Sequence, residues 1–481
     1  MKNKLVFFLA FIAFPLIVGL ACSTGAVSTN EEQQSTPVEV AALAEPIREI
    51  EQPTDQTAEI EPGEELPDEE TLPSTPVQGV DLAGDYLLIS KQTWGSSEDE
   101  VDQIYVGFIL QNQSPELTLK DVEYEITLLD SNGQVIGQEW NTYPYLFPEQ
   151  SLGIFYLTYQ MEGTPLVSDV DITFGFGDIS APNEFFNPLN IEKPKYYWEG
   201  LQRPFVTGLI KNVDQFTYAD FKTNILLFNA DGVIVGGGIA LNDFVPSQEQ
   251  MGFATAVDAF DSVVSVEAYP VLTTYSKSYE DSEAFWSRSS ILDENFYIGN
   301  INQMFGGAII KNNLKDLVLE NAIFSVTFLN EEGYVTNFGT EYIDYLLPGE
   351  TLGVSPYISS HTLDANPATY TAFIFPGEIV EDYEISQNVF RVNNAVLGGS
   401  TKDLVTVNFT NTYSKQASSV DIYVLLYDES GNILGGEKYY SLDPISAGST
   451  FNFELYVSYD TAQTVSRVEA WVLPSYITKF E

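Results

Sequence analysis

The chain has 481 residues, 44% of them hydrophobic, and its 69 acidic against 20 basic side chains give a formal net charge of −49. This charge excludes nucleic-acid binding as a main function, because contact with a phosphate backbone needs a basic face. One cysteine and one histidine exclude disulfide frameworks, cysteine-based zinc sites, iron–sulfur clusters and most histidine metal sites, so we expect no cofactor.

Residues 1–21 have the pattern of an export signal. Two lysines precede an apolar run from Leu5 to Ala21, which is short for a membrane-spanning helix but typical of a signal segment. The run ends directly before Cys22, and this arrangement resembles a bacterial lipoprotein signal. The resemblance implies cleavage before Cys22, lipidation of that residue, and attachment to the cell membrane or outer membrane on the extracytoplasmic side. An ordinary cleaved signal or an uncleaved anchor is the alternative.

Residues 22–80 are rich in Glu, Pro and Thr and contain no aromatic residue. Such a segment cannot bury enough apolar surface to offset the entropy of ordering, so we expect it to be disordered. Repulsion between its like charges should extend it, which suits a stalk or spacer between a membrane and a folded region.

Residues 81–481 contain a unit that recurs four times. An apolar run ends in Asn112, Asn212, Asn312 and Asn411, at spacings of 100, 100 and 99 residues. About twenty residues later a turn-like segment contains Gly133, Gly232, Gly333 and Gly431, at spacings of 99, 101 and 98 residues. The register predicts four tandem domains at 81–182, 183–280, 281–380 and 381–481.

Each unit has the pattern of an antiparallel β-sandwich. In the first unit, apolar and polar residues alternate from Val122 to Leu128, which predicts a half-buried strand. Asp130–Gly133 and Asp428–Gly431 are predicted hairpin turns, in which the Asp side chain caps the turn and Gly takes a positive φ. Short strands, frequent turns and about 100 residues per unit predict an all-β fold of four immunoglobulin-like sandwiches.

These motifs resemble the FxLYD-type domain, a family of Ig-like modules of prokaryotic exported and lipid-anchored proteins. The resemblance rests on the Asn that ends a strand, on LYDESGNILG (Leu426–Gly435) and on the turn LPGETLG (Leu347–Gly353). It implies a fold and a location, and it carries no catalytic residue.

The chemistry of the side chains gives few candidate sites. His361 has Ser359, Ser360 and Asp364 near it in sequence, but a triad needs groups that converge from separate elements, so we interpret it as a loop residue and expect no enzyme. Acidic loops that contain Asp99, Asp102 and Asp281 are weak calcium candidates, because they lack the spacing of a calcium loop. Solvated acidic loops are the favoured interpretation.

Aromatic residues gather where the units meet. Tyr196, Tyr197 and Trp198 precede the second unit's apolar run, and Trp286 precedes that of the third. Consecutive aromatic residues on a strand cannot all point inward, so some are expected at a junction between units or exposed as a ligand platform.

Together these features predict a lipid-anchored cell-envelope protein that displays its modules for adhesion, envelope structure or protein docking. Its partners are expected to be the membrane, through Cys22, and a protein or glycan. The alternative is an accessory lipoprotein that binds a glycan or another extracellular solute, with or without calcium.

Overall fold

The computed structural model describes residues 86–96, 103–159, 165–180, 186–198, 203–280, 282–299, 303–360, 367–381, 383–399 and 402–481. These residues belong to one compact unit, Val77–Glu481. The predictions for residues 1–80, including Cys22, lie outside the described residues, as do those for Asp99, Asp102, Asp281 and His361.

The described residues form β-strands joined in antiparallel sheets, with one short helix between Glu283 and Trp286. The predicted all-β fold of antiparallel sheets is confirmed. Repeat 1 contains β1 (Leu87–Ser96), β2 (Gln103–Asn112), β3 (Leu119–Leu129), β4 (Val135–Leu146), β5 (Ser151–Tyr159), β6 (Asp169–Gly175) and β7 (Asp178–Ile179). Repeat 2 contains β8 (Leu189–Tyr197), β9 (Phe205–Asn212), β10 (Phe216–Phe228), β11 (Ile234–Val245), β12 (Gln250–Ala256), β13 (Asp258–Ala259), β14 (Ser265–Val271) and β15 (Lys277–Glu280).

The same order of strands continues in the second half. Repeat 3 contains α3 (Glu283–Trp286), β16 (Ser289–Ile298), β17 (Met304–Asn312), β18 (Val318–Leu329), β19 (Val335–Leu346), β20 (Thr351–Val354), β21 (Tyr357–Ser360), β22 (Thr369–Phe375) and β23 (Glu378–Val380). Repeat 4 contains β24 (Phe390–Gly398), β25 (Leu404–Asn411), β26 (Val420–Tyr427), β27 (Ile433–Ser441), β28 (Thr450–Tyr456), β29 (Ser458–Tyr459) and β30 (Arg467–Leu473).

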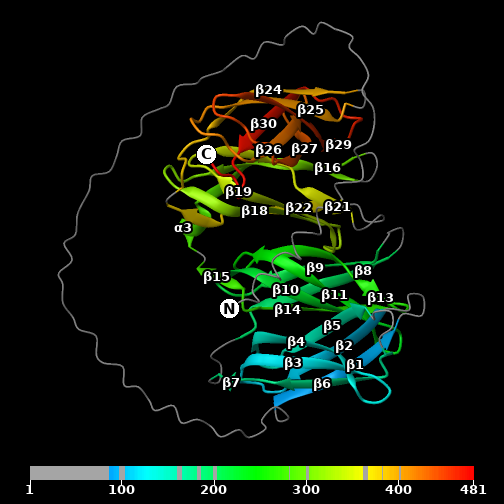
Figure 1. The fold of residues 1–481 in the computed structure, drawn as a ribbon. Helices are drawn as coiled ribbons and strands as arrows, with labels where there is room; N and C mark the ends of the chain where they lie inside the picture. Colours follow the sequence, from blue (N-terminus) through cyan, green and yellow to red (C-terminus); the bar gives the residue numbers. More distant parts are fainter. Residues whose placement is uncertain are drawn as a thin grey trace, which may run out of the picture. The chain divides into compact units, whose positions relative to one another are not determined.

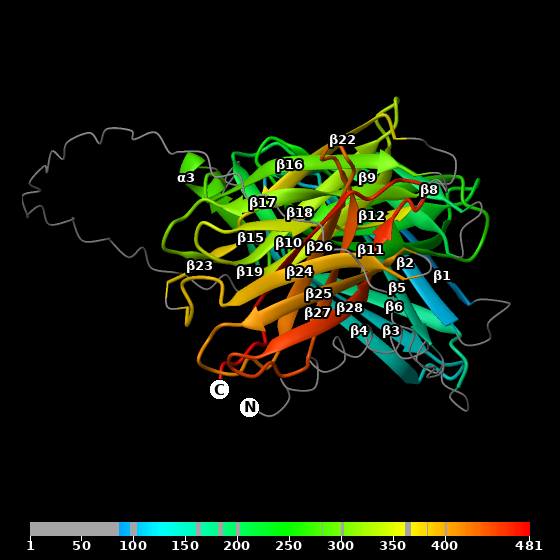
Figure 2. The ribbon, with the colours of Figure 1, turned by 90° about the horizontal axis from the view of Figure 1, so that it is seen from above.

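Every repeat has one small and one large sheet. The small sheets are β1-β2-β5, β8-β9-β12, β16-β17-β20 and β24-β25-β28, each of three strands (the last is labelled in Figure 2). The large sheets are centred on β3, β10, β18 and β26 (Figure 1). The pairing therefore recurs with the period seen in the sequence, while separate folding of each repeat stays a prediction.

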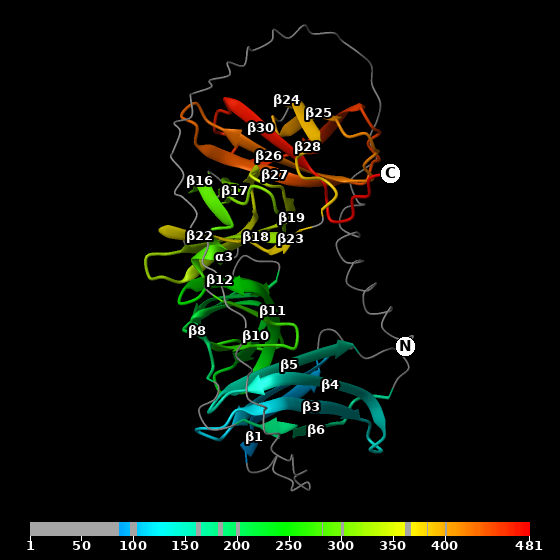
Figure 3. The same cartoon turned by 90° about the vertical axis from the view of Figure 1, so that its left-hand side faces the viewer.

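The two sheets of a repeat face each other across an apolar core. In repeat 1, Phe108 and Leu110 of β2 meet Val122 and Ile126 of β3, and all four are fully buried (Figure 3 shows β3 and β5 of the two sheets). Alternate residues of each strand supply this core, as expected for a half-buried strand. The period-two pattern in the sequence thus places one face of each sheet inside.

The asparagine that ends the second strand ties the repeat together. Asn112 is fully buried, and its Nδ2 donates to the carbonyl oxygens of Leu117, Leu146 and Phe147 at 2.8, 3.0 and 3.0 Å. Its Oδ1 accepts from the backbone N–H of Ser114 at 3.0 Å. Asn212, Asn312 and Asn411 make corresponding bonds. One side chain therefore satisfies several buried backbone groups at a sheet end, which explains its recurrence.

Successive repeats meet in the same way three times. The outer face of each small sheet packs on the outer face of the next large sheet. At the first junction, Ile109 of β2 packs with Leu226, Phe228, Ile234 and Tyr269 of repeat 2. At the second, the Gly252 N–H donates to Thr327 Oγ1 at 2.9 Å. At the third, Ile309 and Trp471 pack around Leu425, Tyr427 and Ile433.

Glycine allows this close approach. A Cβ on Gly153 of β5 would lie 2.4 Å from Cε2 of Tyr269, and one on Gly353 would lie 2.4 Å from Cζ3 of Trp471. Gly252 occupies the corresponding place at the second junction, 2.6 Å from Thr327 Cγ2 by the same measure. Contacts this short leave no room for a side chain at the glycine, so the backbone of the small sheet lies directly against side chains of the next large sheet.

Gly153→Val is expected to loosen the first junction, because the new side chain overlaps the buried ring of Tyr269. Overpacking of this kind costs about 1–3 kcal/mol, measured as the free energy of unfolding in a denaturant titration. Gly398→Val is the matched control, because a Cβ there meets no heavy atom within 4 Å. Equal losses in the two variants would contradict the role given to Gly153.

The two outermost sheet faces are polar instead. On the small sheet of repeat 4, Asn408 and Asn452 stand where repeat 3 has Ile309 and Gly353. Hydrogen bonds cross this exposed face from Asn393 to Asn408 and from Asn408 to Asn452, at 2.8 and 2.6 Å. The outer face of the large sheet of repeat 1 carries acidic side chains and an exposed tryptophan, namely Glu123, Glu125, Asp171 and Trp140. Neither face repeats the apolar surface of the junctions.

Candidate functional site: a polar pocket at the third junction

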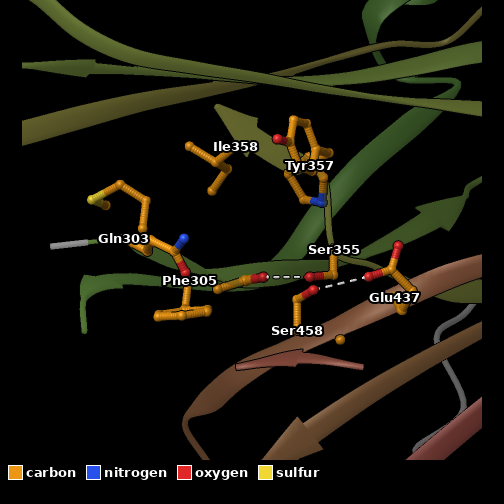
Figure 4. A pocket seen from close by; sticks show the side chains of 11 residues that line it. Gln303, Phe305, Ser355, Tyr357, Ile358, Glu437 and Ser458 are labelled. Carbon is orange, nitrogen blue, oxygen red and sulfur yellow. Dashed lines mark hydrogen bonds between the residues drawn. The ribbon is translucent and has the colours of Figure 1, made fainter. Parts of the chain in front are cut away.

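A pocket of about 190 Å³ lies where repeat 3 meets repeat 4 (Figure 4). One wall comes from β17 and from the segment that joins β20 to β21, and the other comes from β27 and β29. The described lining residues are Gln303, Met304, Phe305, Gly306, Ser355, Pro356, Tyr357, Ile358, Gly436, Glu437 and Ser458.

Pro356 explains why the pocket exists. In repeat 1, β5 pairs with β2 as far as Tyr159. In repeat 3 the corresponding strand, β20, pairs with β17 only through Val354, and β21 then pairs with β19 of the large sheet. The corresponding strands of repeats 2 and 4 also pass to the large sheet, but only after Ala256 and Tyr456. Proline has no backbone N–H to continue a ladder, so the strand of repeat 3 leaves the small sheet earlier. The first half of β17 consequently has no neighbouring strand on that side within the described residues, and the pocket opens beside it.

The hydrogen bonds around the pocket leave it rich in acceptors. Ser355 Oγ donates to the Gly306 carbonyl at 2.8 Å, and Ser458 Oγ donates to Glu437 Oε2 at 3.1 Å (dashed in Figure 4). Each serine has thus committed its proton and keeps lone pairs that can accept. Glu437 is half-buried, and burial raises the pKa of its carboxyl above the ordinary value. None of the described lining residues is lysine or arginine.

The corresponding place at the first junction is filled by aromatic side chains. Phe155 lies two residues after Gly153, as Ser355 lies two residues after Gly353, and its ring lies against Gly237. Tyr105 stacks on Phe260 nearby, with ring centroids 4.5 Å apart. The third junction therefore has a small hydroxyl where the first has a phenyl ring.

A second group of charges lies at the same junction, around Lys438, which follows Glu437 in β27. Lys438 Nζ lies 3.3 Å from Asp421 Oδ2 and 3.9 Å from Glu341 Oε1, and it donates to the Tyr342 carbonyl at 2.7 Å. Its ammonium also lies 5.2 Å from the centroid of the buried Tyr423 ring. We call Glu341, Asp421 and Lys438 the junction charge cluster.

Carboxylates outnumber the lysine in this cluster. Burial raises the pKa of Glu341 to about 8 and that of Asp421 to about 7, and Lys438 opposes both shifts. The carboxylate of Asp344 also raises both values. The cluster therefore tends to hold protons near neutral pH, since its excess of negative charge is poorly solvated.

The structure separates the predicted aromatic candidates. Tyr196 of β8 and Trp286 of α3 pack against the core of repeat 2. Tyr197 lies beside Lys195, whose ammonium is 5.0 Å from its ring centroid and 5.1 Å from that of Tyr334 in repeat 3. Trp198 is 54% exposed. These side chains do not form one common platform, and the pocket lies at a different junction.

The predicted turn residues lie in hairpin turns. Asp130 Oδ1 accepts from the backbone N–H groups of Asn132 and Gln134 at 2.8 Å each, and Asp428 Oδ1 makes the same pair of bonds. Gly133, Gly232, Gly333 and Gly431 have φ values of 72°, 71°, 76° and 86°. The carboxylates of Asp130 and Asp428 are therefore already engaged in hydrogen bonds within their own turns.

Two other properties concern the described part of the chain. Its side chains include no group of three His, Cys, Asp or Glu residues arranged to hold a metal ion. No helix within it has the length and apolar character to cross a bilayer.

No family model fits the chain, and no curated protein is significantly similar to it.

The pocket can bind a small polar group through hydrogen bonds and through the charge of Glu437. Sequence reasoning missed Glu437, Ser355 and Ser458, because their juxtaposition depends on how two repeats pack. A weak signal was present: the sequence SPY at 355–357 places a proline where a strand continues in repeat 1.

Proposed function

We propose that this chain is a non-enzymatic cell-envelope lipoprotein, anchored through Cys22, whose β-sandwich repeats serve adhesion, envelope structure or protein docking. The repeats are proposed to be FxLYD-type modules. The observation that supports a displayed array is the threefold recurrence of one junction, in which a glycine-lined small sheet packs on the next large sheet. Repeated junctions of one kind hold neighbouring modules in a defined relation, which suits presentation of a binding surface.

The anchor is tested by metabolic labelling with a fatty acid. The parent chain is expected to carry label in the membrane fraction, and Cys22→Ala to lose it, because lipid is attached through that sulfur. Ser23→Ala serves as the control and should keep the label. Label retained by Cys22→Ala would contradict the proposed anchor.

A solute-binding accessory role is the second candidate, supported by the polar pocket at the third junction. A thermal-shift screen of the full chain against calcium and envelope polysaccharides separates the two functions. A ligand that binds the native state raises the unfolding midpoint by mass action. A rise with one polysaccharide or with calcium would favour the accessory role, and an unchanged midpoint favours docking.

A further inference from the structure

The polar side chains that line the third-junction pocket offer mainly hydrogen-bond acceptors. Its polar side chains present lone pairs: the Glu437 carboxylate, and the Ser355 and Ser458 hydroxyl oxygens whose protons are committed to Gly306 and Glu437. A group that only donates hydrogen bonds complements such a lining. A primary ammonium has three donors and no acceptor.

The charge of the lining residues also favours a cation. Glu437 is a half-buried carboxylate without a basic residue among the described lining. Its neighbour Lys438 does not line the pocket, and its ammonium lies 3.3 Å from Asp421 Oδ2. An incoming cation would therefore supply the charge that Glu437 lacks within the pocket.

The apolar walls select further. Met304 and Phe305 are nearly buried, and Ile358 borders the same space. A hydrated metal ion gains nothing from such walls, whereas an alkyl chain that carries the ammonium would pack against them. The volume of about 190 Å³ suits a chain of a few methylenes.

We propose that this pocket binds the end of a primary alkylammonium, with Glu437 as the counter-ion and the Ser355 and Ser458 oxygens as acceptors. The group can come from a free amine or from a lysine side chain of a polypeptide. This site is independent of lipid anchoring and of the proposed docking function.

The test is calorimetric titration of the full chain with n-butylammonium, and with n-butanol as the neutral match. It is run at about 0.15 M salt, because diffuse attraction to a highly acidic protein is then largely screened. Butylammonium is expected to bind and butanol is not. A blocked Gly-Lys-Gly peptide, with norleucine as its control, is the second arm. Tighter binding of the lysine peptide assigns the site to a polypeptide, and binding of butylammonium alone assigns it to free amines.

Four variants test where the amine binds. Glu437→Gln should weaken butylammonium binding by about 10- to 100-fold, because a charge-assisted hydrogen bond is lost. Ser355→Phe, which introduces the residue of the first junction, should abolish binding while the carboxylate remains. Glu454→Gln, on the exposed face of β28, should leave binding unchanged. Ser458→Ala should weaken binding and serves as a second pocket variant if the unfolding midpoint of Ser355→Phe falls.

Absence of butylammonium binding would overturn the proposal. So would binding that Glu437→Gln and Ser355→Phe leave unchanged, because the attraction would then come from the net charge of −49 and not from the pocket.

Discussion

Lys438→Met is expected to lower the free energy of unfolding by about 3–5 kcal/mol at pH 8, because it removes the counter-ion of two buried carboxylates. Asp421 is 1% exposed and lies 3.3 Å from the ammonium, so it has little access to water once the lysine is gone. Denaturant unfolding of parent and variant measures the loss. Lys277→Met is the matched control: its ion pair with Glu378 is half-exposed, so we expect a loss below about 1 kcal/mol.

The same variant should show a distinctive dependence on pH. The folded state holds Glu341 and Asp421 at a pKa of about 8 and about 7, above their ordinary values of 4.5 and 3.8. At pH values between the ordinary and the raised pKa of each group, the folded chain binds more protons than the unfolded chain. The contribution of the two groups to stability therefore falls as pH rises. Without Lys438 both folded-state pKa values rise further, so the fall continues to higher pH. The deficit of the variant should therefore shrink at pH 5, and a deficit independent of pH would contradict this account.

Asn112→Leu is expected to cost about 3–5 kcal/mol, since it leaves three carbonyl oxygens and one N–H without their side-chain partner in a buried corner. The thermal unfolding midpoint and denaturant titration of the full chain measure it. The effect should be largest for probes within repeat 1, such as the hydrogen exchange of backbone amides near Phe108.

Asn452→Leu provides the comparison. Asn452 is exposed and accepts one hydrogen bond, from Asn408 at 2.6 Å, so its loss should stay below about 1 kcal/mol. Similar losses in both variants would contradict the role of the recurring asparagine as the hydrogen-bond partner of buried backbone groups.

The sequence predicted those features that depend on neighbouring residues. Alternation from Val122 to Leu128 predicted a strand with one buried face, and β3 confirms it. All residues of β26 are buried instead, because its outer face lies in the third junction. The recurrence of Asn112 along the chain was visible, but its role was not, because the carbonyls it binds come from Leu117, Leu146 and Phe147, up to 35 residues away.

The junctions and the pocket could not be predicted in this way. Whether Gly153 contacts Tyr269, or Lys438 contacts Asp421, depends on which sheet faces pack together. Local pattern does not encode this choice. The sequence indicated that Tyr196, Tyr197 and Trp198 could not all point inward. Which of them enters the core, lies near repeat 3 or stays exposed depends on the same packing.

The polar face of β25 and β28 limits where a repeat can be added to such a chain by gene duplication. A duplicated repeat 2 carries both a glycine-lined small sheet and an apolar large-sheet face, so it can be inserted between existing repeats. A repeat appended against Asn408 and Asn452 would have to dehydrate an amide ladder and would find no glycine opposite its aromatic ring. An added repeat is therefore expected to be inserted between existing repeats and not beside the polar face of β25 and β28.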